Sequence, residues 1–393
     1  MRFTLRGTRL VDATMDLAEA NITVDGSHIE QIGRDTHLRG KVLDASSTIV
    51  MPGFIDVHTH GGGGFELHTT NADEIRAYAH WVPGTGVTSF LAGVVGTPGA
   101  LPLGQLRAAV EATEEPGTGA EMLGIHLEGP YINVKRRGAH PPIWLRQPDC
   151  AETEQILELT RGHLRLITIA PELPGAHTMI RRLVEAGVTV SIGHTDATFE
   201  QAEEAISLGI THATHCFNAM RPLLHRAPGP IAAIARAPQV QGELIADGVH
   251  VHPEVMRLLV KMLGPQRTVV ITDALAAAGL ANGVKFEFAG QVAEVMCGAA
   301  HLADGTLTGS VLTMEQALRN MLKITQVSLS EAVGMLTLNP ARAAQVAERK
   351  GRLQAGYEAD LLIFDSSLHL QATICRGQFT YATGAWRTLL SEE

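Results

Sequence analysis

Short runs of apolar and β-branched residues recur through the middle of the chain, and helix-like segments separate them. The runs are almost continuously apolar, which is typical of parallel strands buried on both faces. Three of the intervening segments are amphipathic and end at a glycine that suits a helix C-terminus, namely AHTMIRRLVEAG, ATFEQAEEAISLG and PEVMRLLVKMLG. Strands are predicted at eight places, which are residues 54–58, 87–94, 123–128, 164–170, 188–193, 211–215, 242–247 and 268–273.

This alternation predicts an α/β protein whose main domain is a (β/α)8 TIM-like barrel over residues 51–343. Eight strand–helix units over roughly 230 residues fit that fold, for which about 250 residues are typical. A doubly wound sheet also alternates, but it rarely has eight units and it gathers its polar residues at one switch point. The helical segments GSVLTMEQALRNMLKIT and LSEAVGMLTLNPARAAQV are expected to pack beside the barrel.

The two ends of the chain share a residue pattern that differs from the pattern of the middle. Residues 1–50 and 344–393 both contain short β-rich runs separated by Gly, Asp and Ser, such as FTLRGTRLVD and GRLQAGYEADLLIFD. We therefore predict one small discontinuous β-sandwich domain that is built from both termini.

The amino-acid composition limits the possible binding partners of the chain more than it limits the possible folds. The chain has 393 residues, of which 45% are hydrophobic and 18% charged, and a net charge of −10 without any basic block. These values suit a folded protein with a large core and argue against nucleic acid or an anionic membrane as a partner. No stretch approaches the ~18 apolar residues of a membrane span, and the N-terminus does not read as a signal peptide.

The spacing of the four cysteines indicates whether the protein resides in a reducing or an oxidising compartment. Cys150, Cys216, Cys297 and Cys375 show no CxxC spacing and no dense framework. Free thiols in a reducing environment are therefore expected, and with them a cytoplasmic protein.

Residues that bind metal ions gather where the predicted strands end. His58 and His60 lie at the end of the first strand, Glu128 ends the third, His194 follows the fifth and His215 ends the sixth. All strands of a (β/α)8 barrel open their C-terminal ends onto one face, so these side chains are expected to converge. A single histidine at a strand end is more often structural than a ligand. Five such residues in one barrel predict a site for Zn2+, Fe2+, Mn2+ or Co2+.

Alternation along a strand refines this site. His58 and His60 are two residues apart, so both could face one ion, and Glu128 could ligate one ion or bridge two. His212 precedes His215 by three residues and is expected to be a core or supporting histidine rather than a ligand.

Asp273 ends the eighth strand and is the candidate catalytic residue. An aspartate at this place can merely cap the next turn. Beside a divalent ion it can also take a proton from water and pass it to a leaving nitrogen, which is the interpretation we favour. Motifs of other enzyme classes are missing, because there is no G-x-S-x-G, no GxxxxGK[ST] and no GxGxxG that opens a helix. A metal-dependent hydrolase is therefore predicted.

Nine short motifs carry a family resemblance, and they occur in the order PGFIDVHTHG, HLEGPY, GAHPP, APE, SIGHTDAT, THCFNAM, ADGVHVHP, ITDA and LTGS. From about residue 51 to 340, the chain resembles the N-acetylglucosamine-6-phosphate deacetylase family of the amidohydrolase superfamily. The resemblance implies hydrolysis of N-acetyl-D-glucosamine 6-phosphate to D-glucosamine 6-phosphate and acetate. It also implies that Glu128, His194 and His215 hold the main ion, with Asp273 as proton donor and acceptor.

The same resemblance implies a substrate pocket. His140 is expected near the acetyl carbonyl and Arg226 near the phosphate, since guanidinium pairs with phosphate oxygens bidentately. The substrate-binding residues implied in this way are Ala139, His140, Asn218, Ala219, Arg226, His250, Leu307, Thr308 and Gly309.

Several alternatives stay open on the sequence alone. Some family members lack both histidines of HxH and use one ion, whereas this chain keeps His58 and His60, so one or two ions per subunit are possible. Members are typically homodimers, and Arg226 acts either in its own subunit or across the interface. The alternative functions are deacetylation of N-acetyl-D-galactosamine 6-phosphate, hydrolysis of another N-acyl or cyclic amide, and an inactive barrel kept for protein interaction.

Overall fold

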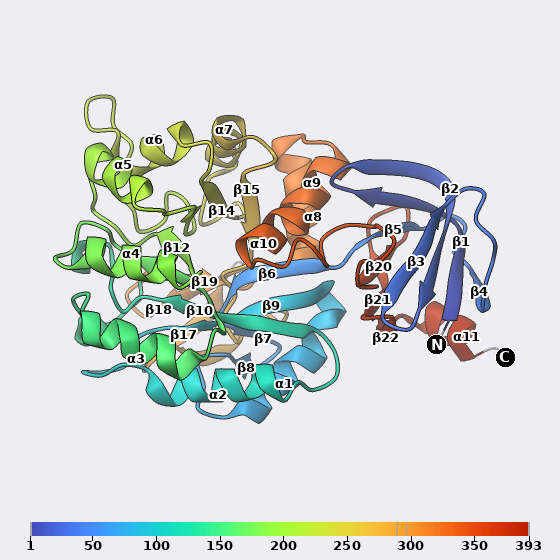
Figure 1. Ribbon diagram of the computed structural model, residues 1–393, viewed down its shortest axis with the longest axis horizontal. Coiled ribbons are helices and arrows are strands. Elements are labelled where there is room, and N and C mark those ends of the chain that lie inside the picture. Colours follow the sequence, from blue (N-terminus) through green and yellow to red (C-terminus); the bar gives the residue numbers. More distant parts are fainter. Residues whose placement is uncertain (1, 289, 297, 392–393) are drawn as a thin grey trace.

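A (β/α)8 barrel forms the centre of the computed structural model, which describes residues 2–288, 290–296 and 298–391. Every neighbouring pair in its eight-stranded sheet is parallel (Figure 1). All eight predicted strands are confirmed. In sheet order they are β6 (Phe54–Thr59), β9 (Val87–Val94), β10 (Glu121–Glu128), β11 (Leu164–Ile169), β12 (Thr189–Ile192), β13 (His212–Ala213), β14 (Gln241–Ile245) and β15 (Thr268–Ile271).

Hydrogen bonds between the first strand and the residues that directly follow the last strand close the barrel. The backbone N–H of Asp273 donates to the carbonyl of His58 over 2.8 Å. The buried carboxylate of Asp56 accepts from the Thr272 hydroxyl over 2.6 Å. The closure therefore joins the segment that carries the HxH pair to the segment that carries the candidate catalytic aspartate.

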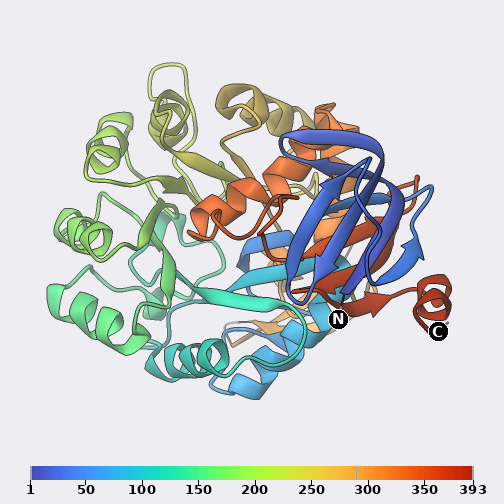
Figure 2. The ribbon, with the colours of Figure 1, turned by 45° about the vertical axis from the view of Figure 1, so that its right-hand side comes forward.

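Helices cover the outside of the strands, as Figure 2 shows. Their amphipathic faces explain the packing, since Met179, Ile180 and Leu183 of one helix are buried in the barrel core. The covering helices are α1 (Ala72–Trp81), α2 (Leu103–Glu114), α3 (Cys150–Thr160), α4 (Ala176–Glu185), α5 (Phe199–Ser207), α6 (Gly229–Arg236) and α7 (Pro253–Leu263). The helices expected beside the barrel are α8 (Met314–Thr325), α9 (Leu329–Leu336) and α10 (Leu338–Ala343).

Strands from both ends of the chain share one sheet beside the barrel, in the order β22-β21-β20-β5-β1-β2-β3 with β4 paired to β1. The sheet curls, because the rings of Phe3 on β1 and Phe379 on β22 lie 5.4 Å apart although ~19 Å would separate those strands in a flat sheet. Its members are β1 (Arg2–Asp12), β2 (Met15–Asp25), β3 (His28–Gly33), β4 (Lys41–Asp44), β5 (Ile49–Pro52), β20 (Leu361–Phe364), β21 (Leu370–Cys375) and β22 (Gln378–Ala382), followed by α11 (Gly384–Ser391). The domain limits at residues 50 and 343 stay predictions.

An antiparallel sheet between β15 and α8 was not among the sequence-based predictions. It contains β16 (Lys285–Phe288), β17 (Gln291–Met296), β18 (Ala299–Leu302) and β19 (Leu307–Ser310). The last strand is tied to the end of the barrel, because the N–H of Ser310 donates to the carbonyl of Asp273 over 2.6 Å. This sheet therefore stands at the C-terminal face of the barrel. The remaining short elements there are β7 (Gly61–Gly62), β8 (Phe65–Glu66), η2 (Val134–Arg136) and η3 (Pro142–Trp144). The short helix η1 (Val82–Thr85) lies instead just before β9, where the Pro83 carbonyl accepts a hydrogen bond from Thr373 of β21.

A buried cluster of charged side chains connects the barrel sheet with the sheet that both ends of the chain share. The Lys350 ammonium lies 2.8 Å from Glu121, at the start of β10, and 2.6 Å from Glu358, and it also contacts Asp360 just before β20. Burial raises the pKa of Glu121, but Arg349 and Lys350 outweigh burial and lower that pKa to about 2. The strand that ends in Glu128 is thus anchored at its other end to the terminal sheet.

Two further observations concern membrane-spanning helices and the state of the cysteines. Among the described residues, no helix is both long and apolar enough to cross a bilayer. Cys150, Cys216 and Cys375 are free thiols, and Cys297 lies outside the described residues.

Candidate metal centre and active site

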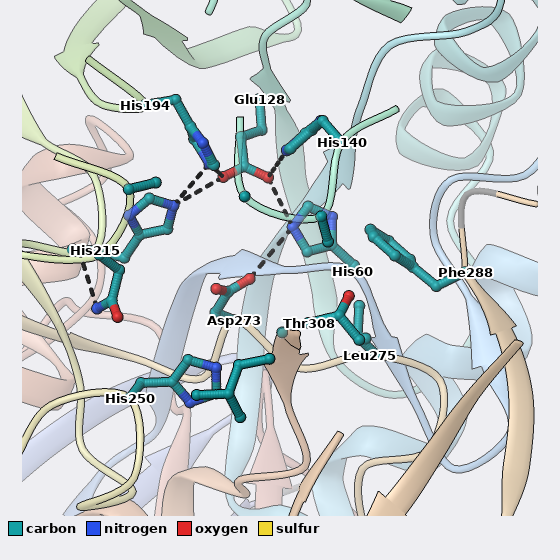
Figure 3. A pocket seen from close by; sticks show the side chains of 16 residues that line it. His60, Glu128, His140, His194, His215, His250, Asp273, Leu275, Phe288 and Thr308 are labelled. Carbon is teal, nitrogen blue, oxygen red and sulfur yellow. Dashed lines mark hydrogen bonds and ion pairs between the residues drawn. The ribbon is translucent and has the colours of Figure 1, made fainter. Parts of the chain in front are cut away.

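The five predicted metal ligands and Asp273 converge at the C-terminal ends of the barrel strands. Figure 3 shows Asp273 together with His60, Glu128, His194 and His215. They form two groups, and within each group the possible ligand atoms lie within 4.8 Å of one another. No member is more than 9% exposed. The groups are Glu128 with His194 and His215, and His58 with His60 and Asp273.

The first group is a tight triangle of one carboxylate oxygen and two ring nitrogens. Glu128 Oε1 lies 3.0 Å from His194 Nε2 and 3.1 Å from His215 Nε2, and the two nitrogens are 3.0 Å apart. His194 Nδ1 donates to the carbonyl of Arg136 over 2.7 Å, so Nε2 carries the lone pair. Burial lowers the pKa of His194 to about 4, which keeps the ring neutral. A lone pair that faces a carboxylate at this distance calls for a cation between them.

The spacing of this triangle suits a small divalent ion. Nitrogen and oxygen ligands at 2.0–2.2 Å from a tetrahedral zinc ion lie roughly 3.3–3.6 Å from one another. The edges of 3.0–3.1 Å need to open by only a few tenths of an ångström to match this value. Glu128, His194 and His215 therefore fit a metal ion.

The second group contains a buried nitrogen without a hydrogen-bond partner. His58 Nδ1 donates to Glu243 Oε2 over 2.8 Å. Its Nε2 is buried and unpartnered, and it faces Glu128 Oε1 and Asp273 Oδ1 at 3.5 Å each. His60 Nε2 lies 3.4 Å from the same Asp273 oxygen. This unpartnered nitrogen between carboxylates is a position for a second cation. Burial lowers the pKa of His58, but Glu243, Glu128 and Asp273 outweigh burial and raise that pKa well above its ordinary value, so a proton competes for the same position.

A proton competes with a metal ion for His60. Burial lowers the pKa of this ring, but Asp273 and Glu128 outweigh it and raise the pKa to about 9. Metal binding at this histidine must therefore release a proton, which makes the affinity depend on pH.

Glu128 lies between the two groups. Its Oε1 belongs to the triangle with His194 and His215, while Oε2 lies 3.1 Å from His60 Nε2 and 3.6 Å from His140 Nε2. Burial raises the pKa of this carboxyl, but His58 and hydrogen bonds from the neighbouring rings outweigh it and hold the pKa well below its ordinary value. The ionised carboxylate is placed to bridge two ions.

Local backbone geometry brings these side chains into reach. His194, His215 and Asp273 have φ angles of 45°, 26° and 49°, a left-handed region that non-glycine residues seldom adopt. Such strain concentrates at functional sites because surrounding contacts maintain it. Gly93 leaves room for the ring of His60, since a Cβ at this position would come within 2.6 Å of His60 Nδ1.

A pocket lies over the centre, with about 650 Å³ of empty space that includes its opening to solvent. Eight of the nine predicted substrate-binding residues line it. They are Ala139, His140, Asn218, Ala219, His250, Leu307, Thr308 and Gly309. Arg226 does not line it in this chain but lies exposed on the loop before α6. His58 lies below the floor, fully buried.

Sequence reasoning missed several residues of this region. Leu275, Phe288 and Gly138 also line the pocket, and Phe288 comes from the unpredicted antiparallel sheet. Glu243 is fully buried on β14 and supports His58. A charged residue inside the apolar run GELIAD was the available signal, because a buried carboxylate needs partners.

Comparison with known proteins agrees with this geometry. The amidohydrolase family model matches residues 49–384. The N-acetylglucosamine-6-phosphate deacetylase of Lysinibacillus sphaericus is 34% identical over 380 residues, which are 96% of this chain and 98% of that protein. The N-acetylgalactosamine-6-phosphate deacetylase of Escherichia coli O157:H7 is 36% identical over 337 residues, which are 86% of this chain and 89% of that one.

Solved structures give the same result. A variant of the N-acetyl-D-glucosamine-6-phosphate deacetylase of Mycobacterium smegmatis, in complex with N-acetyl-D-glucosamine-6-phosphate, matches with a TM-score of 0.92 and 33% identity over 97% of this chain and 100% of that chain. The corresponding enzyme of Pasteurella multocida matches with a TM-score of 0.91 and 28% identity over 98% and 100%. The chain therefore belongs to the amidohydrolase family, in the group of sequences that includes these deacetylases.

Proposed function

We propose that this protein hydrolyses the acetamide of N-acetyl-D-glucosamine 6-phosphate to D-glucosamine 6-phosphate and acetate. The observation that carries the proposal is that Asp273 lies beside the histidines and the glutamate of both ligand groups at the bottom of one pocket. Similarity to a deacetylase named for this substrate, over 96% of the chain, supports the choice of substrate.

The proposed cofactor is one or two divalent ions per subunit, from among Zn2+, Fe2+, Mn2+ and Co2+. Imidazole and carboxylate ligands suit these ions. Glu128, His194 and His215 would hold the main ion, and His58 and His60 the second. When bound, such an ion polarises the amide carbonyl and lowers the pKa of water from 15.7 towards about 7.

Asp273 is the proposed acid and base. Burial raises the pKa of its carboxyl, but His58 and His60 outweigh burial, so the pKa is lowered and the group is ionised at neutral pH. The carboxylate faces the pocket and can accept a proton from the attacking water. It then donates this proton to the amide nitrogen as the C–N bond breaks. His140, on the opposite wall, is proposed to stabilise the negative charge that develops on the carbonyl oxygen.

The phosphate is proposed to be recognised across a homodimer interface. No lysine or arginine is among the described residues that line the pocket, although the substrate is dianionic. Arg226 is exposed, and Leu223 and Leu224 on its loop are 43% and 57% exposed, an apolar surface that a second copy could cover. We propose that Arg226 of each subunit reaches the partner's pocket.

The free thiols of Cys150, Cys216 and Cys375 support the proposed cytoplasmic location.

Arg226→Ala is expected to raise the KM for the phosphosugar by about 10–100-fold and to change kcat little. A hydrogen bond to a charged group contributes about 1.5–3 kcal/mol, and this contact binds a part of the substrate that does not react. Steady-state rates of acetate release measure both constants. His225→Ala, on the same exposed loop, is the matched control and should behave as the unaltered protein. An equal loss on unphosphorylated N-acetylglucosamine would contradict the assigned phosphate contact.

The proposed function itself is tested by acetate release from three substrates. The expected order of kcat/KM places N-acetyl-D-glucosamine 6-phosphate first, with N-acetyl-D-galactosamine 6-phosphate and unphosphorylated N-acetylglucosamine each lower by about tenfold or more, a difference of ~1.4 kcal/mol. Preference for the galacto sugar would replace the proposal with the second candidate, which similarity to the Escherichia coli O157:H7 enzyme favours. No acetate from either phosphosugar, with metal bound, would refute both candidates.

A further inference from the structure

Glu243 is a buried charge to which the mechanism above assigns no part. Its side chain is fully buried on β14, inside the barrel wall and below the floor of the pocket. No arginine or lysine contacts its carboxylate among the described residues; its partners are histidines. An ionised carboxylate in such a place is costly unless each oxygen is satisfied, so its partners are informative.

Three N–H groups satisfy this carboxylate. Oε2 accepts from His58 Nδ1 over 2.8 Å and from the backbone N–H of His215 over 2.9 Å. Oε1 accepts from His212 Nε2 over 3.0 Å. One oxygen thus contacts a residue from each of the two ligand groups.

The contact with His58 has a chemical consequence. A carboxylate oxygen only accepts, so Nδ1 of His58 donates to Glu243, and Nε2 is the nitrogen that the ring presents to an ion. This Nε2 is the buried nitrogen that lacks a partner and lies 3.5 Å from both Glu128 and Asp273. Without Glu243, the ring would lose the hydrogen bond that holds it in this direction.

The contact between Glu243 and His215 involves the backbone of His215 and not its ring. It holds a backbone N–H, while the ring that faces the main ion is free of Glu243. The same backbone turn is also held by Asn218, whose N–H donates to the carbonyl of His215 over 3.0 Å. Loss of the carboxylate should therefore disturb His58 far more than His215.

We infer that Glu243 is the positioning residue of the second metal site, which fixes the tautomer and direction of His58 so that Nε2 is available to an ion. The inference rests on the two-ion arrangement proposed above. Carboxylates that orient a histidine ligand typically change metal affinity by 10–100-fold when removed. Its expected signature is selective loss of one ion while the other stays.

The test is metal content, measured without reference to turnover. Metal-free protein is equilibrated with Zn2+ at a series of buffered free concentrations, and bound ions per chain are determined by elemental analysis. The unaltered protein is expected to bind two ions. Glu243→Gln, which keeps the size of the side chain, is expected to bind the main ion as before and the second about 10–100-fold more weakly.

Two further variants isolate the route through His58. His212→Gln is the matched control, because it changes the other oxygen's partner and should retain both ions. His58→Gln should lose the second ion, and the double variant of Glu243 and His58 should bind no worse than His58→Gln alone, since the carboxylate acts through that ring.

The inference is overturned if Glu243→Gln binds the second ion as tightly as the unaltered protein, if it loses both ions equally, or if His212→Gln shows the same loss. One ion in the unaltered protein at every concentration also overturns it, whereas deacetylation is judged separately by acetate release. Should Glu243→Gln not fold, 15N NMR of the histidine rings in the metal-free unaltered protein decides. A His58 ring that carries a proton on Nδ1 supports the inference, and a neutral ring protonated on Nε2 alone overturns it.

Discussion

Asp273→Asn is expected to lower kcat for the phosphosugar by about 10⁴, at the upper end of what proton transfer by a positioned side chain contributes. Asparagine has the same shape, so the backbone bonds that Asp273 makes to His58 and Ser310 can persist. The amide cannot accept a proton from water or return it to the leaving nitrogen. The loss should therefore appear in kcat, with KM changed by much less.

Three measurements accompany this variant. Thermal unfolding should show a folded protein, and elemental analysis should show the main ion, because Glu128, His194 and His215 are untouched. Asp304→Asn, in the exposed turn before β19, is the control for removal of a carboxylate and should keep full activity. Retention of most of the kcat by Asp273→Asn would show that another group moves the proton.

Glu128→Gln is expected to abolish measurable turnover through loss of metal rather than loss of acid–base chemistry. The carboxylate contacts three ring nitrogens at 3.0–3.1 Å, from His60, His194 and His215. The neutral amide offers one acceptor in place of two and removes a negative charge from the centre of both groups. We expect the affinity for the main ion to fall by more than ~100-fold, the upper limit typical of residues that only support a ligand.

A comparison with chelated protein separates the two explanations for lost activity. The unaltered protein should lose its activity on removal of metal and regain it when Zn2+ is added back, whereas Glu128→Gln should not recover. Zinc should also raise the Tm of the unaltered protein but hardly that of the variant, because a ligand stabilises only in proportion to its binding. A variant that binds zinc normally and yet is inactive would disprove the assignment of Glu128 as a ligand.

The barrel could be predicted because its strands are buried on both faces and stand out as apolar runs. The segment from β16 to β19 was not predicted, although KFEF alternates exposed with half-buried positions and the buried Ala293 and Val295 of QVAEVM alternate with exposed or half-buried neighbours. Short alternating runs are also common in irregular surface segments, so pattern alone does not show that four of them pair. The contact between Phe3 and Phe379 depends on residues far apart in sequence, which no local pattern encodes.

The part of the site that lies at the ends of the barrel strands could be predicted from the sequence. His58, Glu128 and Asp273 were found because topology brings all strand ends of a barrel together. Glu243 was missed because, within a run buried on both sides, the sequence does not show which side chains point inward. Arg226 was expected near the phosphate, either in its own subunit or across an interface. In the single chain it is exposed on the loop before α6, and the sequence does not show where a loop residue points.

The sheet shared by the two termini has a consequence for biosynthesis. β1 to β5 leave the ribosome first, yet their partner β20 begins only at Leu361, paired to β5 along Ile49–Pro52. At 5–20 residues per second, the chain between them takes about 15–60 s to be made. During that time the edge of β5 is unpaired and offers backbone groups to other nascent chains. Protection of this edge, by a chaperone or by early closure of the barrel, becomes a requirement for producing the enzyme in quantity.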